Sequence, residues 1–338
     1  MSNKPIIYLL GYQSNHTHTY PQSRFFEVFN FLGFETRWVD KSEIQPSNGR
    51  RIFVCWDQPN AKYLVDNNIY TSGDVILQKV TALVPSYGNP PNLNWGDTKE
   101  SATQFLKNLN WPAYQMITDL LGQGINIYGF GCNTFYKDFP HKNKLVTDLL
   151  SQDRLFYHPW GPCLYDKAEI DAAKPIINDF DYDIGYVGSI WGVTGRGNVD
   201  TIGKFLNPLV QGKSCAIGGL GTPLGPVNDN SHKNILKKSK LCPIVNALVW
   251  NMEGGVQDRF WTVFASGRFG VVDNEGVYEF FDKDEVVCAT EPEEYIELSQ
   301  YYLDHPEKQL PFIENILSRI QKEYNWYNTW SKILNSLK

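Results

Sequence analysis

The amino-acid sequence predicts an α/β fold with two consecutive Rossmann-like domains that face a central cleft. Short apolar runs alternate with amphipathic helical patterns along most of the chain, which is typical of parallel sheets covered by helices. The length of 338 residues exceeds one typical core and suits two domains. A turn-rich segment, His158-Pro-Trp-Gly-Pro-Cys163, divides the alternation into two halves. We therefore expect one domain at 1–160 and a second at 161–320.

The first half alternates strand and helix patterns from its beginning. The run Ile6-Ile-Tyr-Leu-Leu10 is a strand pattern, and the segment 23–32 is a helix pattern that ends at Gly33. Further strands are expected at 36–39, 51–56, 74–77, 82–84 and 125–128, and further helices at 111–121 and 144–150.

The second half repeats this plan. Strands are expected at 183–187, 214–217, 241–246, 269–272 and 286–289, and helices at 199–209, 232–239, 256–266, 291–303 and 307–324. Ligands of such sheets bind beyond the carboxyl ends of the strands, so the loops that follow strands are the candidate site loops.

Composition narrows the class of protein. The formal net charge of −6 gives no basic surface for non-specific nucleic-acid binding. No apolar run approaches the roughly 20 residues of a membrane span, and no signal-peptide pattern is present, so we expect a cytoplasmic protein. The six cysteines are scattered without a C-x-x-C pair, which argues against a zinc site or a redox dithiol.

The segment 251–273 contains a glycine loop, a helix pattern and a strand pattern in that order. Gly254 and Gly255 come directly before the helical residues Phe260 and Val263. The unpaired N–H groups and the dipole of a helix N-terminus suit a phosphate group. An ordinary helix start with two turn glycines is the alternative that spacing alone favours.

Two other loops of the second half follow strand patterns. The first contains Gly188 and ends near Arg196, an arginine suited to a phosphate or a bound acceptor. The second contains Gly218 and Gly219, which allow the main chain to approach a base or a sugar closely. A solvent loop and a plain long turn remain the alternatives.

Charged motifs near the second half have plainer interpretations. Asp179-Phe-Asp181-Tyr-Asp183 has the D-x-D spacing of some metal sites, but it precedes a strand, so a solvated turn is favoured. The lysines at 233, 237, 238 and 240 fit a solvated helix face or a phosphate contact, with Lys238 as the candidate.

Polar residues also follow strands in the first half. His16 and His18 come after the first strand, where a general base or a substrate-orienting residue would face the cleft. Asp57 follows the third expected strand and is a candidate for acceptor contact. Exposed histidines without a catalytic role are the alternative. No third ligand accompanies the histidines, so no metal site is predicted.

Several pieces of the second half resemble, in order and spacing, the C-terminal half of GT-B glycosyltransferases. They are similar above all to the CgeB-like (spore maturation protein-like) group. The pieces are Asp183-Ile-Gly-Tyr-Val-Gly-Ser189, Asp258-Arg-Phe-Trp-Thr-Val-Phe-Ala-Ser-Gly267, Phe269-Gly-Val-Val-Asp273, the helix pattern 293–303 with Asp304-His-Pro-Glu307, and Tyr324-Asn-Trp-Tyr-Asn-Thr-Trp330.

The resemblance implies a hexosyltransferase-like enzyme that needs neither a cofactor nor a bound metal. The second domain would hold a nucleotide-diphosphate sugar, and the first would hold an acceptor that is a glycan, a lipid, a protein or a small molecule. A C-terminal helix at about 320–338 would pack back on the first domain. The glycine loop and helix start would bind the diphosphate without a cation.

One departure from related retaining enzymes concerns their two glutamates. Glu253 matches the first, but Trp261 stands at the position of the second. An indole cannot accept hydrogen bonds from ribose hydroxyls as a carboxylate does. Retaining stereochemistry is therefore a hypothesis.

We predict a soluble glycosyltransferase with His16, His18, Asp57 and Glu253 as catalytic candidates. A binding protein of the same fold that has lost the reaction, and a transferase that acts on modified DNA, are the alternatives. The predicted donor contacts are Gly188, Ser189, Arg196, Gly218, Gly219, Lys238, Gly254, Gly255, Val256, Arg259 and Trp261.

Overall fold

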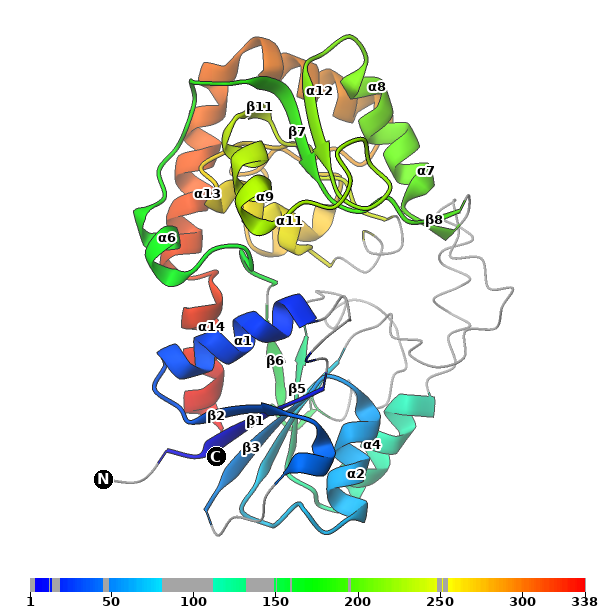
Figure 1. Cartoon of the computed structure of the whole chain (residues 1–338), viewed down its shortest axis with the longest axis vertical. Coiled ribbons are helices and arrows are strands. Elements are labelled where there is room, and N and C mark those ends of the chain that lie inside the picture. Colours follow the sequence, from blue (N-terminus) through cyan, green and yellow to red (C-terminus); the bar gives the residue numbers. More distant parts are fainter. Residues whose placement is uncertain are drawn as a thin grey trace. The chain divides into compact units, whose positions relative to one another are not determined.

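The computed structural model describes most of the chain and divides it into two compact units (Figure 1). The described residues are 4–11, 13, 19–44, 49–80, 112–131, 149, 151–158, 160–193, 196–247, 251 and 255–337, with only the main chain at 19, 20, 58, 112–114, 157, 193 and 196. The first unit takes its described residues from Met1–Asn89, Leu109–Pro159 and Trp326–Lys338. The second takes them from Trp160–Asn325.

The first unit contains a six-stranded sheet in the order β2-β1-β3-β4-β5-β6. Every neighbouring pair of strands is parallel, as the alternation of patterns predicts. The strands are β1 (Ile6–Leu10), β2 (Thr36–Val39), β3 (Arg51–Cys55), β4 (Val75–Lys79), β5 (Ile127–Gly131) and β6 (Leu155–Tyr157).

Helices cover both faces of this sheet. Helices α2 (Gln58–Asp66) and α4 (Pro112–Gly122) pack on the face that carries Tyr8, Leu10 and Phe53. Helices α1 (Thr19–Phe31) and α14 (Trp326–Ser336) lie against each other on the opposite face, and a short 3-10 turn, η1 (Lys41–Glu43), follows β2.

An aromatic cluster attaches the chain's last helix to the first unit. The ring of Trp330, fully buried, lies 5.0 Å from Phe25, 4.9 Å from Phe29 and 5.3 Å from Phe130 between centroids. His158 packs on the same indole at 5.0 Å, and burial lowers the pKa of His158 to about 3. A neutral imidazole therefore belongs to this hydrophobic contact at physiological pH.

The second unit contains a parallel sheet whose fully hydrogen-bonded part is β10-β7-β11. These strands are β7 (Tyr182–Val187), β10 (Cys215–Gly218) and β11 (Ser239–Leu241). The expected strands at 269–272 and 286–289 are reduced to single parallel bridges, Ile244↔Val272 and Val272↔Cys288. They extend the sheet beyond β11.

The helices of the second unit surround this sheet (Figure 1). A two-stranded hairpin, β8 (Gly192–Val193) and β9 (Arg196–Gly197), follows β7. The helical segments are α6 (Lys167–Ala172), α7 (Val199–Thr201), the π-helical turn η3 (Ile202–Leu206), α8 (Asn207–Val210), α9 (Asp229–Lys237), α11 (Asp258–Ala265), η4 (Glu275–Glu279), α12 (Pro292–Asp304), η5 (Pro306–Gln309) and α13 (Leu310–Lys322).

The long helix expected at 307–324 is divided in the structure. Pro311 lies in the first turn of α13, where a missing N–H is tolerated, and the residues before it form η5. At the other end, the buried amide of Asn325 donates to the carbonyl of Ile320 at 2.9 Å. This bond satisfies a carbonyl group at the helix end before α14 begins.

Helices α2 and α6 were not anticipated from the sequence. Pro59 lies in the first turn of α2, where proline fits. Helix α6 is six residues long, and a capping box between Asp166 and Glu169 stabilises its start. The strand expected at 82–84 and all but residue 149 of the helix expected at 144–150 lie outside the described residues.

A buried ion pair at the amino ends of β3 and β4 is a stability determinant. Arg51 Nη2 lies 2.7 Å from Asp74 Oδ2, and both side chains are almost fully buried. We expect Asp74→Ala to lower the free energy of unfolding by about 3–5 kcal/mol, because it leaves a buried guanidinium uncompensated. Urea unfolding measures the change. Lys62→Ala, which removes the half-exposed Lys62–Asp66 pair, should cost under about 1 kcal/mol, and an equal loss in both variants contradicts the prediction.

Candidate functional site

Arg259 connects two strand ends at the carboxyl edge of the second sheet. It lies in the first turn of α11, and its Nε donates to the carbonyl of Val187 at 3.3 Å. Its Nη1 donates to the carbonyl of Val245. The first carbonyl ends β7, and the second follows the bridge residue Ile244. Among the described residues no carboxylate lies within ion-pair distance of Arg259, although its charge acts to lower the pKa values of Asp258 and Asp273, which burial raises.

The guanidinium of Arg259 rests on Tyr186. Its Cζ lies 4.5 Å from the ring centroid, which is a favourable cation–π distance. The Tyr186 hydroxyl is buried and has no hydrogen-bond partner among the described residues. A Cβ at Gly188 would collide with Arg259 Nη2, so this position must be glycine while the arginine keeps its place. A cation and an unpaired hydroxyl thus lie together.

The loop after β7 is held in one conformation. The Gly188 N–H donates to the carbonyl of Gly218 at 2.9 Å, so the ladder between β7 and β10 continues past the strands. Asn198, nearly fully buried, donates to the carbonyl of Ser189 and accepts from the N–H of Trp191, both at 2.8 Å. Gly219 has φ +132, and a Cβ there would collide with the Gly188 carbonyl. The glycines therefore permit close contact between the two loops.

A second polar group, the side chain of Asp273, directly follows the bridge residue Val272. The carboxylate of Asp273 accepts from the Asn246 N–H at 2.8 Å and from Asn246 Nδ2 at 3.0 Å. Burial raises the pKa of Asp273 to about 6, although the hydrogen bonds from Asn246 act in the opposite direction. The next residue, Asn274, donates from Nδ2 to the carbonyl of Gly255 at 2.9 Å. Two buried side chains thus tie the strand end to main chain near the glycine loop.

His232, on α9, is a further titratable group near Arg259. Burial, together with the positive charge of Arg259, lowers the pKa of His232 to about 4. At neutral pH it is an uncharged hydrogen-bonding group.

The predicted donor residues are partly brought together. Gly188, Ser189, Gly218 and Gly219 lie in the two adjoining loops, and Arg259 reaches the first of them. Gly255 and Val256 precede α11 and are buried. Arg196 lies in β9, and its side chain is outside the description. His16, His18, Glu253 and Gly254 lie outside the described residues.

Two of the predicted residues lie elsewhere. Lys238 directly precedes β11, at the amino edge of the sheet, where its Nζ lies 2.6 Å from Asp179. Trp261 is fully buried, 5.1 Å from Phe280 and 5.5 Å from Tyr324 between ring centroids. Its side chain packs in an aromatic core and does not lie at the sheet edge where Arg259 binds the strand ends.

In the first unit, Asp57 lies at the N-cap of α2 and makes no side-chain capping bond. Trp56 precedes it, and Lys79 Nζ lies 3.8 Å from the Trp56 ring centroid. Trp56 directly follows β3, and Lys79 ends β4. Five further residues were not predicted as site residues from the sequence: Lys79, Tyr186, His232, Asn246 and Asp273. Only the last had a readable signal, because a charged residue follows the apolar run Phe269-Gly-Val-Val272.

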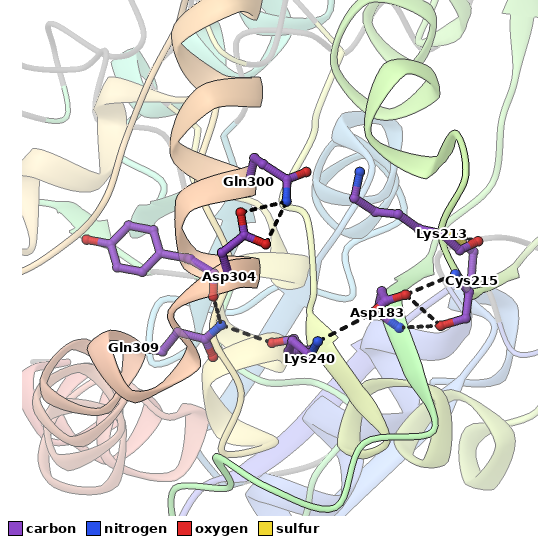
Figure 2. Close-up of polar contacts among 9 residues, drawn as sticks. Asp183, Lys213, Cys215, Lys240, Gln300, Asp304 and Gln309 are labelled. Atoms are coloured by element: carbon purple, nitrogen blue, oxygen red, sulfur yellow. Dashed lines mark hydrogen bonds and ion pairs between the residues drawn. The ribbon is translucent and has the colours of Figure 1, made fainter.

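The D-x-D carboxylates lie at the amino edge, where the sequence placed a turn before a strand. Asp183 accepts from Ser214 Oγ at 2.8 Å and from Lys240 Nζ at 3.3 Å, as Figure 2 shows for the lysine. Gln309 reaches the Lys240 carbonyl at 3.2 Å in the same view. These carboxylates are engaged by protein groups. In the described part of the chain, no three His, Cys, Asp or Glu residues form a metal-binding group.

Comparison with known proteins gives this site a context. Residues 203–335 match a family model described as glycosyl transferase-like. No curated protein matches the sequence significantly.

Solved structures match nearly the whole chain. One is a DNA-modifying enzyme, beta-glucosyltransferase, studied with and without uridine diphosphoglucose (TM-score 0.57, 14% identity, 98% of this chain and 99% of that one). Another is T4 phage BGT with UDP and Mn2+ (TM-score 0.56, 13% identity, 98% of this chain and 100% of that one). A third is an alpha,alpha-trehalose-phosphate synthase (UDP-forming) from Burkholderia vietnamiensis (TM-score 0.51, 9% identity, 99% of this chain and 99% of that one).

At these identities the structural likeness shows the fold, and the family match concerns the second half of the chain. The chain has a GT-B-type fold, and its residues 203–335 are similar to glycosyl transferases. This confirms the predicted fold class and enzyme class, whereas membership of the CgeB-like group stays a prediction. None of the described helices has the length and apolar character that a membrane crossing requires.

The environment of His232 gives a direct test of the site electrostatics. We expect its imidazole to titrate near pH 4, and Arg259→Met to raise that pKa while leaving it below 6.5, because burial remains. Because the folded state binds this proton more weakly than the unfolded state, its contribution to stability falls as the pH drops from about 6.5 to 4. Titration of the imidazole by NMR measures the pKa, and a wild-type value near 6.5 contradicts the arrangement.

Proposed function

We propose that the protein transfers a sugar from a UDP-sugar to an acceptor hydroxyl, and that its second unit binds the donor. The observation that carries the proposal is Arg259, held by two main-chain carbonyls at the carboxyl edge with no carboxylate partner among the described residues. Ligands of open parallel sheets bind at this edge. The similar solved structures are described with UDP or uridine diphosphoglucose, or as UDP-forming, which supports uridine as the base.

The geometry suits stabilisation of a departing diphosphate. A guanidinium has five N–H donors, and two serve the carbonyls of Val187 and Val245. The remaining donors would bind phosphate oxygens, and the buried Tyr186 ring supports the guanidinium. The N–H groups at the start of α11 add the positive end of a helix dipole. Charge that develops on the leaving group would therefore be stabilised by protein groups without a metal.

The acceptor belongs to the first unit in this proposal. The predicted domains, 1–160 with the helix at about 320–338 and 161–320, would then hold acceptor and donor respectively. His16, His18 and Asp57 follow strands of the first sheet and are the candidate bases for the acceptor hydroxyl. A positioned hydroxyl and a stabilised leaving group are the main needs of this chemistry.

Modified DNA is the second candidate acceptor. The observation that favours it is the similar structure described as a DNA-modifying enzyme, which covers 98% of this chain. The net charge of −6 argues against extended phosphate contact. Salt-dependent binding of a duplex that carries hydroxymethylated bases would support DNA, and no binding at low salt would leave the other acceptor classes.

Arg259→Met tests the donor site. We expect the Kd for UDP to rise about tenfold or more, because hydrogen bonds to charged groups contribute about 1.5–3 kcal/mol. Isothermal titration calorimetry measures the Kd. Lys240→Met, which removes a cation at the opposite edge of the same sheet, is the control and should leave the Kd unchanged. Wild-type affinity in Arg259→Met, or equal losses in both variants, would remove Arg259 from the donor site.

Glu253→Gln tests the predicted catalytic carboxylate. We expect slower hydrolysis of UDP-glucose in the absence of acceptor, with an unchanged unfolding midpoint, because the substitution removes a charge and keeps the volume. Release of UDP measures turnover, and unchanged turnover excludes Glu253.

If the wild-type protein binds UDP yet never releases it from UDP-glucose, the alternative of a degenerate binding protein is favoured. NMR of the product anomer tests the hypothesis of retaining stereochemistry, and an inverted anomer contradicts it.

A further inference from the structure

We propose that Asp273 and Asn274 are positioning residues of the donor site. Both are nearly fully buried, and both follow the central bridge residue Val272 at the carboxyl edge of the second sheet. They form hydrogen bonds with Asn246 and Asn251, which precede Gly254 in the sequence, and with Gly255, which follows it. The inference rests on the proposed function and adds to it two residues that were not predicted as donor contacts.

Asp273 fixes the end of the neighbouring strand. Its two carboxylate oxygens accept separately from the N–H and the side-chain amide of Asn246, at 2.8 and 3.0 Å. Its own N–H donates to the carbonyl of Ile244 at 3.2 Å. The residue between these two, Val245, provides the carbonyl that accepts from Arg259 Nη1. The carboxylate of Asp273 therefore sets the main chain that orients Arg259.

The same two residues hold the main chain on each side of Glu253 and Gly254. On one side, Asn251 Nδ2 donates to the carbonyl of Asp273 at 3.0 Å. On the other side, Asn274 Nδ2 donates to the carbonyl of Gly255 at 2.9 Å, and its Oδ1 accepts from the Gly276 N–H at 2.8 Å. Only three residues separate Asn251 from Gly255 in the sequence. Asp273 and Asn274 thus hold the chain both before and after Glu253 and Gly254.

Packing stability alone does not account for a carboxylate at position 273. Burial raises the pKa of Asp273, which means that the surroundings disfavour its charged form overall. A buried charge kept against that penalty is weak evidence of a stabilising role. Tyr295 already joins the two strands, since its hydroxyl accepts from the Ile244 N–H and donates to the Val271 carbonyl. The pairing with Asn246 instead selects one main-chain arrangement.

The test compares Asp273→Ala, Asp273→Asn and Asp183→Ala in the full chain. Asp273→Asn is the conservative variant, because its amide still pairs with Asn246 once the Asn246 amide is reversed. Asp183→Ala is the matched control, because it removes a carboxylate that accepts hydrogen bonds from Ser214 and Lys240 at the amino edge of the same sheet. The readouts are the Kd for UDP, hydrogen exchange of the segment 244–257, and the unfolding midpoint.

We expect Asp273→Ala to raise the Kd for UDP about tenfold and to accelerate amide exchange in 244–257. Asp273→Asn should restore both to within about threefold of wild type. Asp183→Ala should lower the unfolding midpoint without changing either. A wild-type Kd and wild-type exchange in Asp273→Ala would overturn the inference, as would equal effects of the two alanine variants.

The outcome separates this inference from the proposed function. If the wild-type protein does not bind UDP, the donor proposal fails, and the exchange of 244–257 still decides whether Asp273 holds this segment. If the wild-type protein binds UDP and Asp273→Ala changes nothing, the donor proposal stands and the positioning role is rejected. If Asp273→Ala does not fold, Asn246→Ala carries the comparison, and a wild-type Kd with wild-type exchange in Asn246→Ala rejects the role.

Discussion

The bridge that Arg259 makes between two strand ends is the interaction on which the candidate site depends. Strand β7 pairs in parallel with both of its neighbours, so their carboxyl ends share one edge. Arg259 donates to main-chain carbonyls at two points of that edge, after β7 and after Ile244. The space it occupies requires glycine at 188, and the glycines at 188 and 219 bring the two loops into contact. Arg259 thus accounts for the glycine at 188, and the Gly188 carbonyl accounts for the glycine at 219.

The distribution of charge across the second sheet supports this view. At the amino edge, acidic residues pair with Lys238 and Lys240, so positive and negative groups satisfy each other. At the carboxyl edge, neutral carbonyl groups hold Arg259, and no carboxylate of the described residues lies close enough for an ion pair. Carbonyls orient a guanidinium without cancelling its charge. Among the described residues of this sheet, the carboxyl edge therefore carries a cation that no carboxylate binds directly.

Much of the fold could be read from periodicity, and the exceptions have physical causes. The strands at 36–39 and 6–10 match their patterns residue for residue. Helix α2 was not predicted from the sequence; it is nine residues long, and Pro59 fits its first turn. The apolar run 269–272 forms only a single bridge on each side. A pattern reports which residues are buried, whereas strand pairing depends on neighbours that are distant in sequence.

The sequence by itself determined the α/β class, the two-part organisation of patterns and the glycine-rich loops that follow strands, because local periodicity and turn chemistry encode them. Only the tertiary structure decided which residues share an edge. It separated Lys238 and Trp261 from Arg259, and it brought Asp273 to Asn246 across 27 positions. Side-chain function at a sheet edge depends on the register of parallel strands joined by long crossovers, and no local pattern carries that information.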